Sequence, residues 1–364
     1  MTDTMTAAPA GTPAEAPAGL LREAPARRER VGENLNRALH QVLEAHDDAF
    51  LIGEDVLDPY GGAFNIAKGL SDRFGDRVLT TPISENAILG IANGLALTGN
   101  RPIAEMMFGD FITLAFDQIV NFSAKSVTMY GTRHPMHLVV RCPVGGRRGY
   151  GPTHSQSPQK HFLGVPDLHL FELSPFHDSG PVLEGMVELG APCIFFEDKV
   201  LYTERTQLPG TGPVAGLFAL DMVGDDPFPV ARLRVDGVDE PDVVLIAPGG
   251  LAHRAVEAAR DLFLTEEIAC EIYVPTRLYP FDAELLAGPV ARAGRVCVVE
   301  DAPPGGSWGA EVAQQLHSRC WGSLKAPVRL VHSADAVIPT ALHLEQDVLV
   351  SSESLGLALR ETAR

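Results

Sequence analysis

The sequence is short of the features that would place it on a nucleic acid or in a membrane. Its 364 residues carry 29 Lys and Arg against 47 Asp and Glu, a formal net charge of −18. An excess of negative charge repels a phosphate backbone, which argues against nucleic acid or anionic lipid as a partner. No run of about eighteen apolar residues occurs, so no membrane-spanning helix is expected.

Cysteine is scarce and scattered. The five cysteines contain no Cys-x-x-Cys pair; they are Cys142, Cys193, Cys270, Cys297 and Cys320. Four of them lie in apolar or strand-like runs, where buried thiols are common. We therefore expect reduced, structural cysteines, and neither a disulfide framework nor a zinc site.

Two nucleotide-binding motifs are missing as well. No Gly-x-Gly-x-x-Gly fingerprint opens the chain, and "APGGLAH" comes late with a different spacing. No Gly-x-x-x-x-Gly-Lys-Ser/Thr phosphate loop occurs either. These absences exclude the usual dinucleotide-binding and P-loop signatures.

The first thirty residues lack the apolar stretch of a signal peptide. They are rich in Ala and Pro, and Glu15, Glu23 and Glu29 interrupt the basic residues, which also suits a transit peptide poorly. Residues 1–30 are therefore expected to form a disordered tail, and the protein is expected in the cytoplasm.

What is present from Val31 onward is an alternation of helical and strand-like patterns. Helices are expected near 31–45, 85–97, 111–131 and 179–189, and strands near 49–56, 101–107, 136–142 and 192–198. Residues 206–239 are rich in Gly, Pro and polar residues and are expected to be a linker. A second alternation follows, with strands near 242–250, 269–276, 294–301 and 327–332 and helices near 251–263 and 308–319.

This order predicts two α/β domains with mainly parallel sheets covered by helices, at residues 31–205 and 240–364. Because 364 residues exceed one ordinary core, two domains also fit the length.

One carboxylate stands out in the stretch from Arg77 to Phe111. Glu85 lies between a strand-like run and the glycine-studded apolar helix "ENAILGIANGLAL". An acid in the first turn of a helix is favoured by the helix dipole, so a purely structural role is open. An apolar, water-poor setting also disfavours the charged form of a carboxyl group, which suits proton exchange.

Several motifs in one order carry a family resemblance. They are "LIGEDV", "TPISENAILGIANGLAL", "MMFGDFITLAFDQIVNFSAK", "GPTHSQS", "CIFFEDKVLYTER" and, more weakly, "VVEDAPPGGSWGAEVA". The chain resembles the β subunit of the E1 component of 2-oxoacid dehydrogenases, the pyruvate, branched-chain and acetoin group. The resemblance implies a transketolase-like pyrimidine-binding domain followed by a transketolase C-terminal-type domain.

The resemblance also implies thiamine diphosphate as the cofactor, shared with an α subunit. This chain lacks the Gly-Asp-Gly motif that holds magnesium and diphosphate, and "FGDF" is a partial echo of it. Mg2+ is therefore expected on the α subunit, and no metal on this chain. The loop "VELGAPC" lacks the acidic and amide side chains often found at the family's potassium site, which argues against K+.

By the same resemblance, Glu85 hydrogen-bonds the aminopyrimidine ring and favours the imino form that deprotonates the thiazolium carbon. Phe111 would stack on that ring, with Ile83 and Met107 lining the pocket. Phe108 is expected in the core instead. Both catalytic and cofactor-binding roles thus fall on Glu85.

Two further residues match family positions. Glu54, at the end of the first strand, would lie behind the cofactor and link active sites through water; an ordinary strand-end acid is the alternative. His154, in the loop "THSQS", would reach the substrate and donate or shuttle a proton.

A few residues depart from the family pattern, and these bear on which substrate binds. Arg147 and Arg148 occupy a loop often filled by small residues and could grip a carboxylate or phosphate. Surface exposure or a contact with the partner subunit is the alternative. Gln159 stands where many relatives carry Glu.

The function predicted is therefore that of an E1 β subunit which, with its α subunit in an α2β2 heterotetramer, decarboxylates a 2-oxoacid. The acyl group would pass to a lipoyl carrier, with a lipoyl-bearing E2 as a further partner. The alternative is a split transketolase or acyloin-forming carboligase that works without a lipoyl carrier in a biosynthetic pathway. A homologue that has lost its chemistry is the third possibility, against which Glu85, Phe111 and His154 all count.

Overall fold

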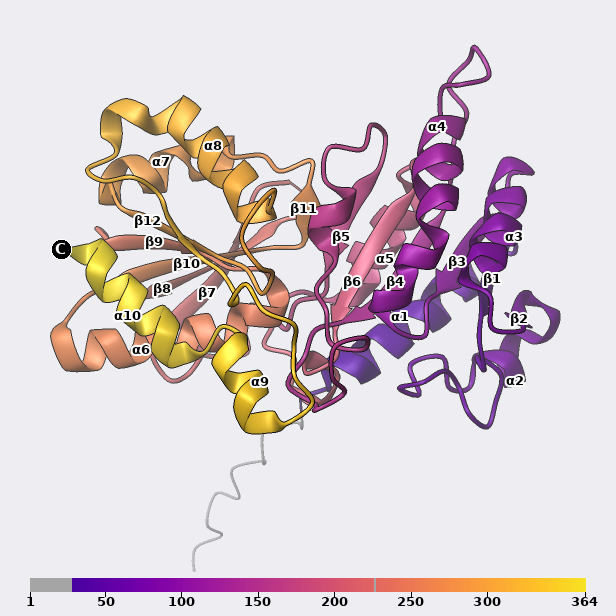
Figure 1. The fold of residues 1–364 in the computed structure, drawn as a ribbon, viewed down its shortest axis with the longest axis horizontal. Helices are drawn as coiled ribbons and strands as arrows, with labels where there is room; N and C mark the ends of the chain where they lie inside the picture. Colours follow the sequence, from indigo (N-terminus) through magenta and orange to yellow (C-terminus); the bar gives the residue numbers. More distant parts are fainter. Residues whose placement is uncertain (1–27, 226) are drawn as a thin grey trace, which may run out of the picture.

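The computed structural model describes residues 28–225 and 227–364, and within them the chain forms two α/β halves, each built on one sheet (Figure 1). The tail expected over residues 1–30 lies outside the described residues except for its last three. Two of these three contact the rest of the first half: the amide of Thr206 donates to the carbonyl of Glu29, and Arg30 forms a β-bridge with Arg205.

The first sheet has the strand order β11-β5-β6-β4-β3-β1-β2, and its strands are parallel except for β11. They are β1 (Ala49–Gly53), β2 (Val78–Thr80), β3 (Arg101–Glu105), β4 (Val139–Val144), β5 (His169–Glu172), β6 (Cys193–Asp198) and β11 (Arg277–Tyr279). Both faces are apolar because both are covered. Ile52 and Ala104 face one buried cluster, and their neighbours Leu51 and Ile103 face the other.

Helices cover each face of this sheet. α1 (Val31–Ala45) and α5 (Ser179–Glu188) pack together on one face, and α3 (Glu85–Leu97) lies on the other; α2 (Leu70–Phe74) is short. α3 begins where its sequence specifies, because the Ser84 hydroxyl accepts the amide hydrogen of Ala87 at 3.4 Å. The helix expected over 85–97 therefore has those bounds.

The long helix expected over 111–131 is irregular. A 3-10 segment spans Gly109–Ala115, a π-helical segment spans Gln118–Ser123, and α4 (Ala124–Ser126) follows. The Ser123 hydroxyl donates to the Gln118 carbonyl at 2.9 Å, and the Asn93 amide donates to the same carbonyl at 3.3 Å. Side chains that compete for a backbone carbonyl in this way widen a turn of helix.

The second sheet has the order β13-β12-β9-β10-β8-β7. Its strands are β7 (Phe218–Val223), β8 (Val230–Val235), β9 (Val243–Ile246), β10 (Cys270–Pro275), β12 (Val296–Val299) and β13 (Arg329–Val331). The linker prediction for 206–239 was wrong in this respect, because β7 and β8 lie within it and pair antiparallel at the sheet edge. Antiparallel strands near the edge of a sheet keep polar residues, here Asp221 of β7 and Arg232 of β8 as an ion pair, and so resemble a linker in composition.

Helices also cover both faces of the second sheet. α6 (Ala252–Glu266) and α10 (Ser352–Ala363) pack on one face, and α7 (Glu284–Ala293) and α8 (Trp308–Cys320) on the other. α9 (Leu342–Val348) lies between the two halves in Figure 1. β11 comes from the second half of the chain yet joins the first sheet beside β5, so the halves share a core. Among the described residues, no helix has the length and apolar character needed to cross a bilayer.

Candidate active site

The parallel strands of the first sheet deliver the predicted site residues to one edge. Glu54 follows β1, Glu85 begins α3 shortly after β2, Phe111 lies in the turn after β3, and His154 lies in the loop after β4. The carboxyl ends of parallel strands form the usual ligand-binding edge of an α/β sheet. Residues up to 100 positions apart in the sequence thus meet at one edge.

Glu54 and Glu85 form a buried pair of carboxyl groups. Each is 5% exposed, and Glu54 Oε1 has no hydrogen-bond partner among the residues that the structure describes. Burial raises the pKa of Glu54, and the negative charge of Glu85 raises it further. A buried acceptor without a partner beside a second carboxyl group fits a ligand that offers ring nitrogens and an amine.

Aromatic rings surround His154. The Phe111 ring lies 5.1 Å from the His154 ring, and the Phe108 ring lies 4.6 Å from it, both edge to face. Phe64 and Tyr150 extend the cluster, at 5.6 and 5.9 Å from Phe108. Phe108 was expected in the core, and the structure places it half-buried in this cluster instead.

The side of the site next to Glu85 is open. Ile83 is 80% exposed, while Met107 is half-buried. Ile91 and Leu114, on α3 and the following 3-10 segment, are 50% and 60% exposed. Exposed apolar residues around a buried carboxyl group are typical of a surface that another chain covers.

The two arginines of the loop after β4 have different surroundings. The Arg147 guanidinium donates to Asp301 at 3.0 Å and to the Val350 carbonyl, which ties it to the second half of the chain. The Arg148 guanidinium donates to the carbonyl of Lys199 at 2.5 Å and lies 5.9 Å from the centroid of Phe64, at the aromatic cluster. The structure therefore brings Arg148, and not Arg147, to the candidate site.

Sequence reasoning missed Lys199, which follows β6 at the same edge. Its side chain is fully buried, its ammonium lies 5.8 Å from the centroid of Phe108, and Nζ has no hydrogen-bond partner within the described part of the chain. Burial lowers the pKa of Lys199 to about 8. Its place directly after a buried strand was the available signal.

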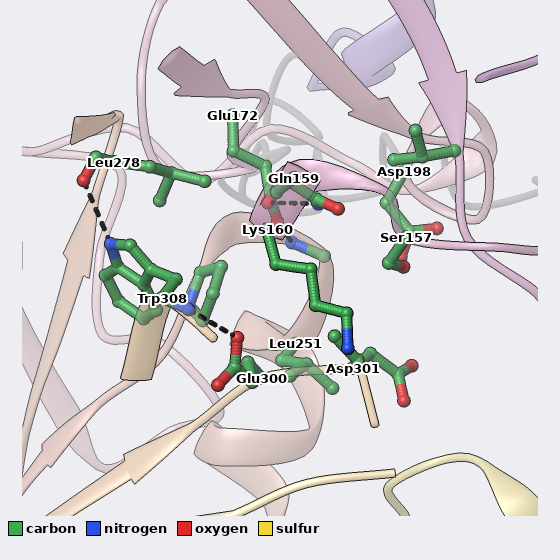
Figure 2. Close-up of a pocket in the computed structure, with 14 residues that line it drawn as sticks. Ser157, Gln159, Lys160, Glu172, Asp198, Leu251, Leu278, Glu300, Asp301 and Trp308 are labelled. Atoms are coloured by element: carbon green, nitrogen blue, oxygen red, sulfur yellow. Dashed lines mark hydrogen bonds between the residues drawn. The ribbon is translucent and has the colours of Figure 1, made fainter. Parts of the chain in front are cut away.

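A cavity of about 30 Å³ lies between the two halves of the chain, and residues of both halves line it (Figure 2). Glu172 accepts hydrogen bonds from Gln159 at 3.0 Å and from the Gly250 amide at 2.9 Å, and so bridges the two halves. Burial raises the pKa of Glu172 to about 7. The cavity has room for about two water molecules and none for a cofactor.

One cluster of possible metal ligands lies away from this edge. His46, Glu184 and Glu188 come within 4.8 Å of one another, at the end of α1 and on α5. His46 is 2.7 Å from Glu184, and Arg101 donates to Glu188 at 3.0 Å, so both carboxylates already have partners within the chain.

Comparison with known proteins finds relatives of both halves of the chain. Residues 30–204 match the transketolase pyrimidine-binding domain, and residues 232–355 match the transketolase C-terminal domain. The chain is 32% identical to the β subunit of acetoin:2,6-dichlorophenolindophenol oxidoreductase from Cupriavidus necator, over 93% of this chain and 98% of that protein. It is 35% identical to subunit β2 of the mitochondrial 2-oxoisovalerate dehydrogenase of Arabidopsis thaliana, over 84% of this chain and 81% of that protein.

A third relative is the β subunit of the mitochondrial pyruvate dehydrogenase E1 component of Saccharomyces cerevisiae, at 32% identity over 91% of this chain and 88% of that protein. Among solved structures, a split-gene transketolase described as an inactive β4 tetramer superposes with a TM-score of 0.69. It covers 92% of this chain and 98% of its own, at 18% identity, and so is similar in fold alone.

Proposed function

The chain belongs to the family of E1 β subunits of thiamine-diphosphate-dependent 2-oxoacid dehydrogenases, and from this premise we propose how its own residues act. Together with an α subunit it decarboxylates a 2-oxoacid and passes the acyl group to a lipoyl carrier. The observation that supports this most directly is the convergence of Glu54, Glu85, Phe111 and His154 at one sheet edge.

Thiamine diphosphate, when bound, supplies the carbon nucleophile that attacks a keto group and accepts the electron pair left by departing CO2. Glu85 would hold a proton shared with a ring nitrogen of the bound cofactor, from a buried position where water competes little. Burial and the neighbouring Glu85 raise the pKa of Glu54, so this pair binds a proton more readily than an exposed carboxyl group does.

Phe111, with Met107 and Ile83 nearby, provides the apolar wall against which a flat heterocycle packs. His154 lies edge to face against Phe111, which orients its ring toward the same space. There it donates a hydrogen bond to the substrate or moves a proton. Arg148 is the residue of this loop that we assign to the substrate carboxylate, since its guanidinium lies at the aromatic cluster.

The partner proposed is an α subunit in an α2β2 heterotetramer, with the α subunit holding Mg2+ and diphosphate. The exposed Ile83, Ile91 and Leu114 beside the buried Glu85 support a covering chain at this place. A lipoyl-bearing E2 would receive the acyl group. We place the enzyme in the cytoplasm and assign no K+ to this chain.

The alternative of a split transketolase or carboligase has less support. The structural likeness to a split-gene transketolase shows the fold, whereas the relatives of 32–35% identity are β subunits of 2-oxoacid and acetoin enzymes. An assay with and without lipoamide separates the two functions.

Replacing Glu85 tests the proposed function. In the complex with the α subunit, we expect Glu85→Gln to slow both 2-oxoacid decarboxylation and deuterium exchange at C2 of bound thiamine diphosphate by at least about 100-fold. NMR of quenched samples measures the exchange. Glu44→Gln, an exposed glutamate on α1, is the matched control and should leave both rates unchanged. Wild-type exchange in the Glu85→Gln complex would disprove the role.

A further inference from the structure

Helix α9 reverses the usual distribution of side chains. Its leucines Leu342 and Leu344 are 57% and 46% exposed, whereas Glu345 is 1% exposed and is the buried residue of the helix. A buried carboxylate is costly unless hydrogen bonds compensate it. Glu345 is therefore expected to have hydrogen-bond donors around its carboxylate.

The partners of Glu345 are backbone amides of the loop that follows β4. The amide of Arg147 donates to Oε1 at 2.7 Å, and the amide of Gly149 donates to Oε2 at 3.2 Å. At Gly146 a Cβ atom would lie 2.9 Å from Oε1, so a residue without a side chain permits the approach. The carboxylate thus lies directly against the loop.

The backbone of this loop is shaped to receive an anion. Gly145, Arg147, Gly149 and Gly151 all have positive φ, between 68° and 84°, alternating with other residues. Alternation of this kind turns successive amide hydrogens toward one side and forms an anion-binding concavity. The anion that fills the concavity comes from α9, 198 residues away from Arg147.

A second set of contacts fixes the same two segments. Asp301 accepts hydrogen bonds from the Arg147 guanidinium at 3.0 Å and from the Val350 amide at 3.1 Å. Thr340 lies against Gly151, where a Cβ atom would come within 2.6 Å of its hydroxyl oxygen. Residues 340–350 therefore hold the loop along its length.

We propose that Glu345 is a positioning residue: its carboxylate occupies the anion-binding concavity of the 145–151 loop and thereby fixes His154 and Arg148 at the active site. The proposal rests on the function proposed for His154. It gives the C-terminal half of the chain a direct part in the geometry of the site. It also explains Arg147, whose side chain anchors the loop to Asp301 and leaves the substrate to its neighbour.

The first test measures the loop itself in the complex with the α subunit. Hydrogen–deuterium exchange followed by mass spectrometry reports the amides of residues 145–155 without any need for activity. We expect Glu345→Ala to accelerate exchange in this peptide at least tenfold, and Glu345→Gln, which keeps the size and an acceptor oxygen, to do so less. Unchanged exchange in both variants would overturn the proposal.

The second test restores the anion. We expect kcat of the Glu345→Ala complex to fall at least tenfold, since small displacements of reacting groups are costly. Formate should recover activity and slow the loop exchange, whereas chloride at the same ionic strength should not. Glu353→Gln, an exposed glutamate on α10, is the matched control and should behave as wild type. A loss of activity that formate leaves unchanged would contradict the role of the carboxylate.

The two proposals fail in distinguishable ways. If the wild-type complex decarboxylates no 2-oxoacid but Glu345→Ala still frees the loop, the function proposed for the site is wrong and the contact stands. If the wild-type complex is active and Glu345→Ala changes neither kcat nor loop exchange, the inference about Glu345 is wrong and the function stands.

Discussion

Lys199 is a buried lysine at the candidate site whose charge lowers the stability of the folded chain. Its ammonium is fully buried, and no hydrogen-bond partner lies within the described residues. Burial lowers the pKa of Lys199 from an ordinary 10.5 to about 8, so at neutral pH the group remains charged in an unfavourable place. A residue that reduces stability at the edge where Phe108 and His154 meet is typical of an active site.

We therefore expect Lys199→Met to stabilise the chain at pH 7, by about 2–3 kcal/mol in the free energy of unfolding. The unfolded chain binds more protons than the folded one between about pH 8 and 10.5, so wild-type stability rises with pH in that window. The advantage of the variant should therefore be largest below pH 8 and vanish near pH 10.5. Urea unfolding at several pH values measures it.

The control for Lys199 is Lys125→Met, which removes an exposed lysine of α4. That change should shift the unfolding free energy by less than about 0.5 kcal/mol at every pH. A destabilised Lys199→Met at pH 7, or a difference that does not change with pH, would show that the ammonium has a partner in solution.

At the scale of single residues, prediction succeeded where the signal was local: Glu85 stands at the first position of α3, because Ser84 caps the helix. Phe111 and His154 were named from family motifs, and their rings lie 5.1 Å apart. Their roles remain predictions. Lys199 and Glu345 were missed because a strand end and an exposed helix gain importance here from contacts between distant segments.

At the scale of elements, a buried charge network joins three neighbouring strands below the site. Arg141 of β4 donates two hydrogen bonds of 2.8 Å to Glu197 of β6 and pairs with Glu105 at the end of β3. The Tyr202 hydroxyl donates to Glu197 at 2.6 Å. One guanidinium thus compensates two carboxylates at the carboxyl edge of the sheet.

Arg141→Met should destabilise the chain by about 3–5 kcal/mol, because it leaves Glu105 and Glu197 buried without a cation. Urea unfolding with circular dichroism measures the loss. Adding Glu105→Gln and Glu197→Gln should recover much of it, since the uncompensated charges are then absent. Arg232→Met, which breaks a partly exposed pair with Asp221, is the control and should cost about 1 kcal/mol or less. Equal losses from the two arginines would contradict this account.

Helices and strands were predicted from the periodic spacing of apolar residues, and this failed where contacts between distant segments determine the local structure. The buried strands β1, β3, β4, β6, β9, β10 and β12 were predicted because both of their faces are apolar, whereas the buried strand β5 was missed. The edge strand β7 and its antiparallel neighbour β8 were not predicted, since their polar side chains resemble those of a linker. The segment 109–126 has the apolar pattern of a helix, and the polar contacts of Ser123 and Asn93 that make it irregular are invisible to periodicity.

At the scale of the whole molecule, the two halves meet at a carboxyl group that can titrate, that of Glu172. Glu172 on β5 accepts a hydrogen bond from Gln159 (Figure 2) and another from the Gly250 amide of the second half. Burial raises the pKa of Glu172 from an ordinary 4.5 to about 7, and the charges of Asp198 and Asp301 add to the effect. A group with a raised pKa gives stability that is present below pH 4.5 and is lost as the pH rises through about 7.

Glu172→Gln removes this dependence because the amide stays neutral and can still accept from Gly250, while its NH2 group can donate to Gln159 Oε1, which lacks a partner among the described residues. We expect the variant to gain on the wild type as pH rises from 5 to 8, by about 2–3 kcal/mol in unfolding free energy. Urea titrations across that range measure the gain. Glu257→Gln, an exposed glutamate on α6, should give a nearly constant difference. If Glu172→Gln also gives a constant difference, the contact between the halves does not titrate, and Glu172 is charged in the folded chain throughout this range.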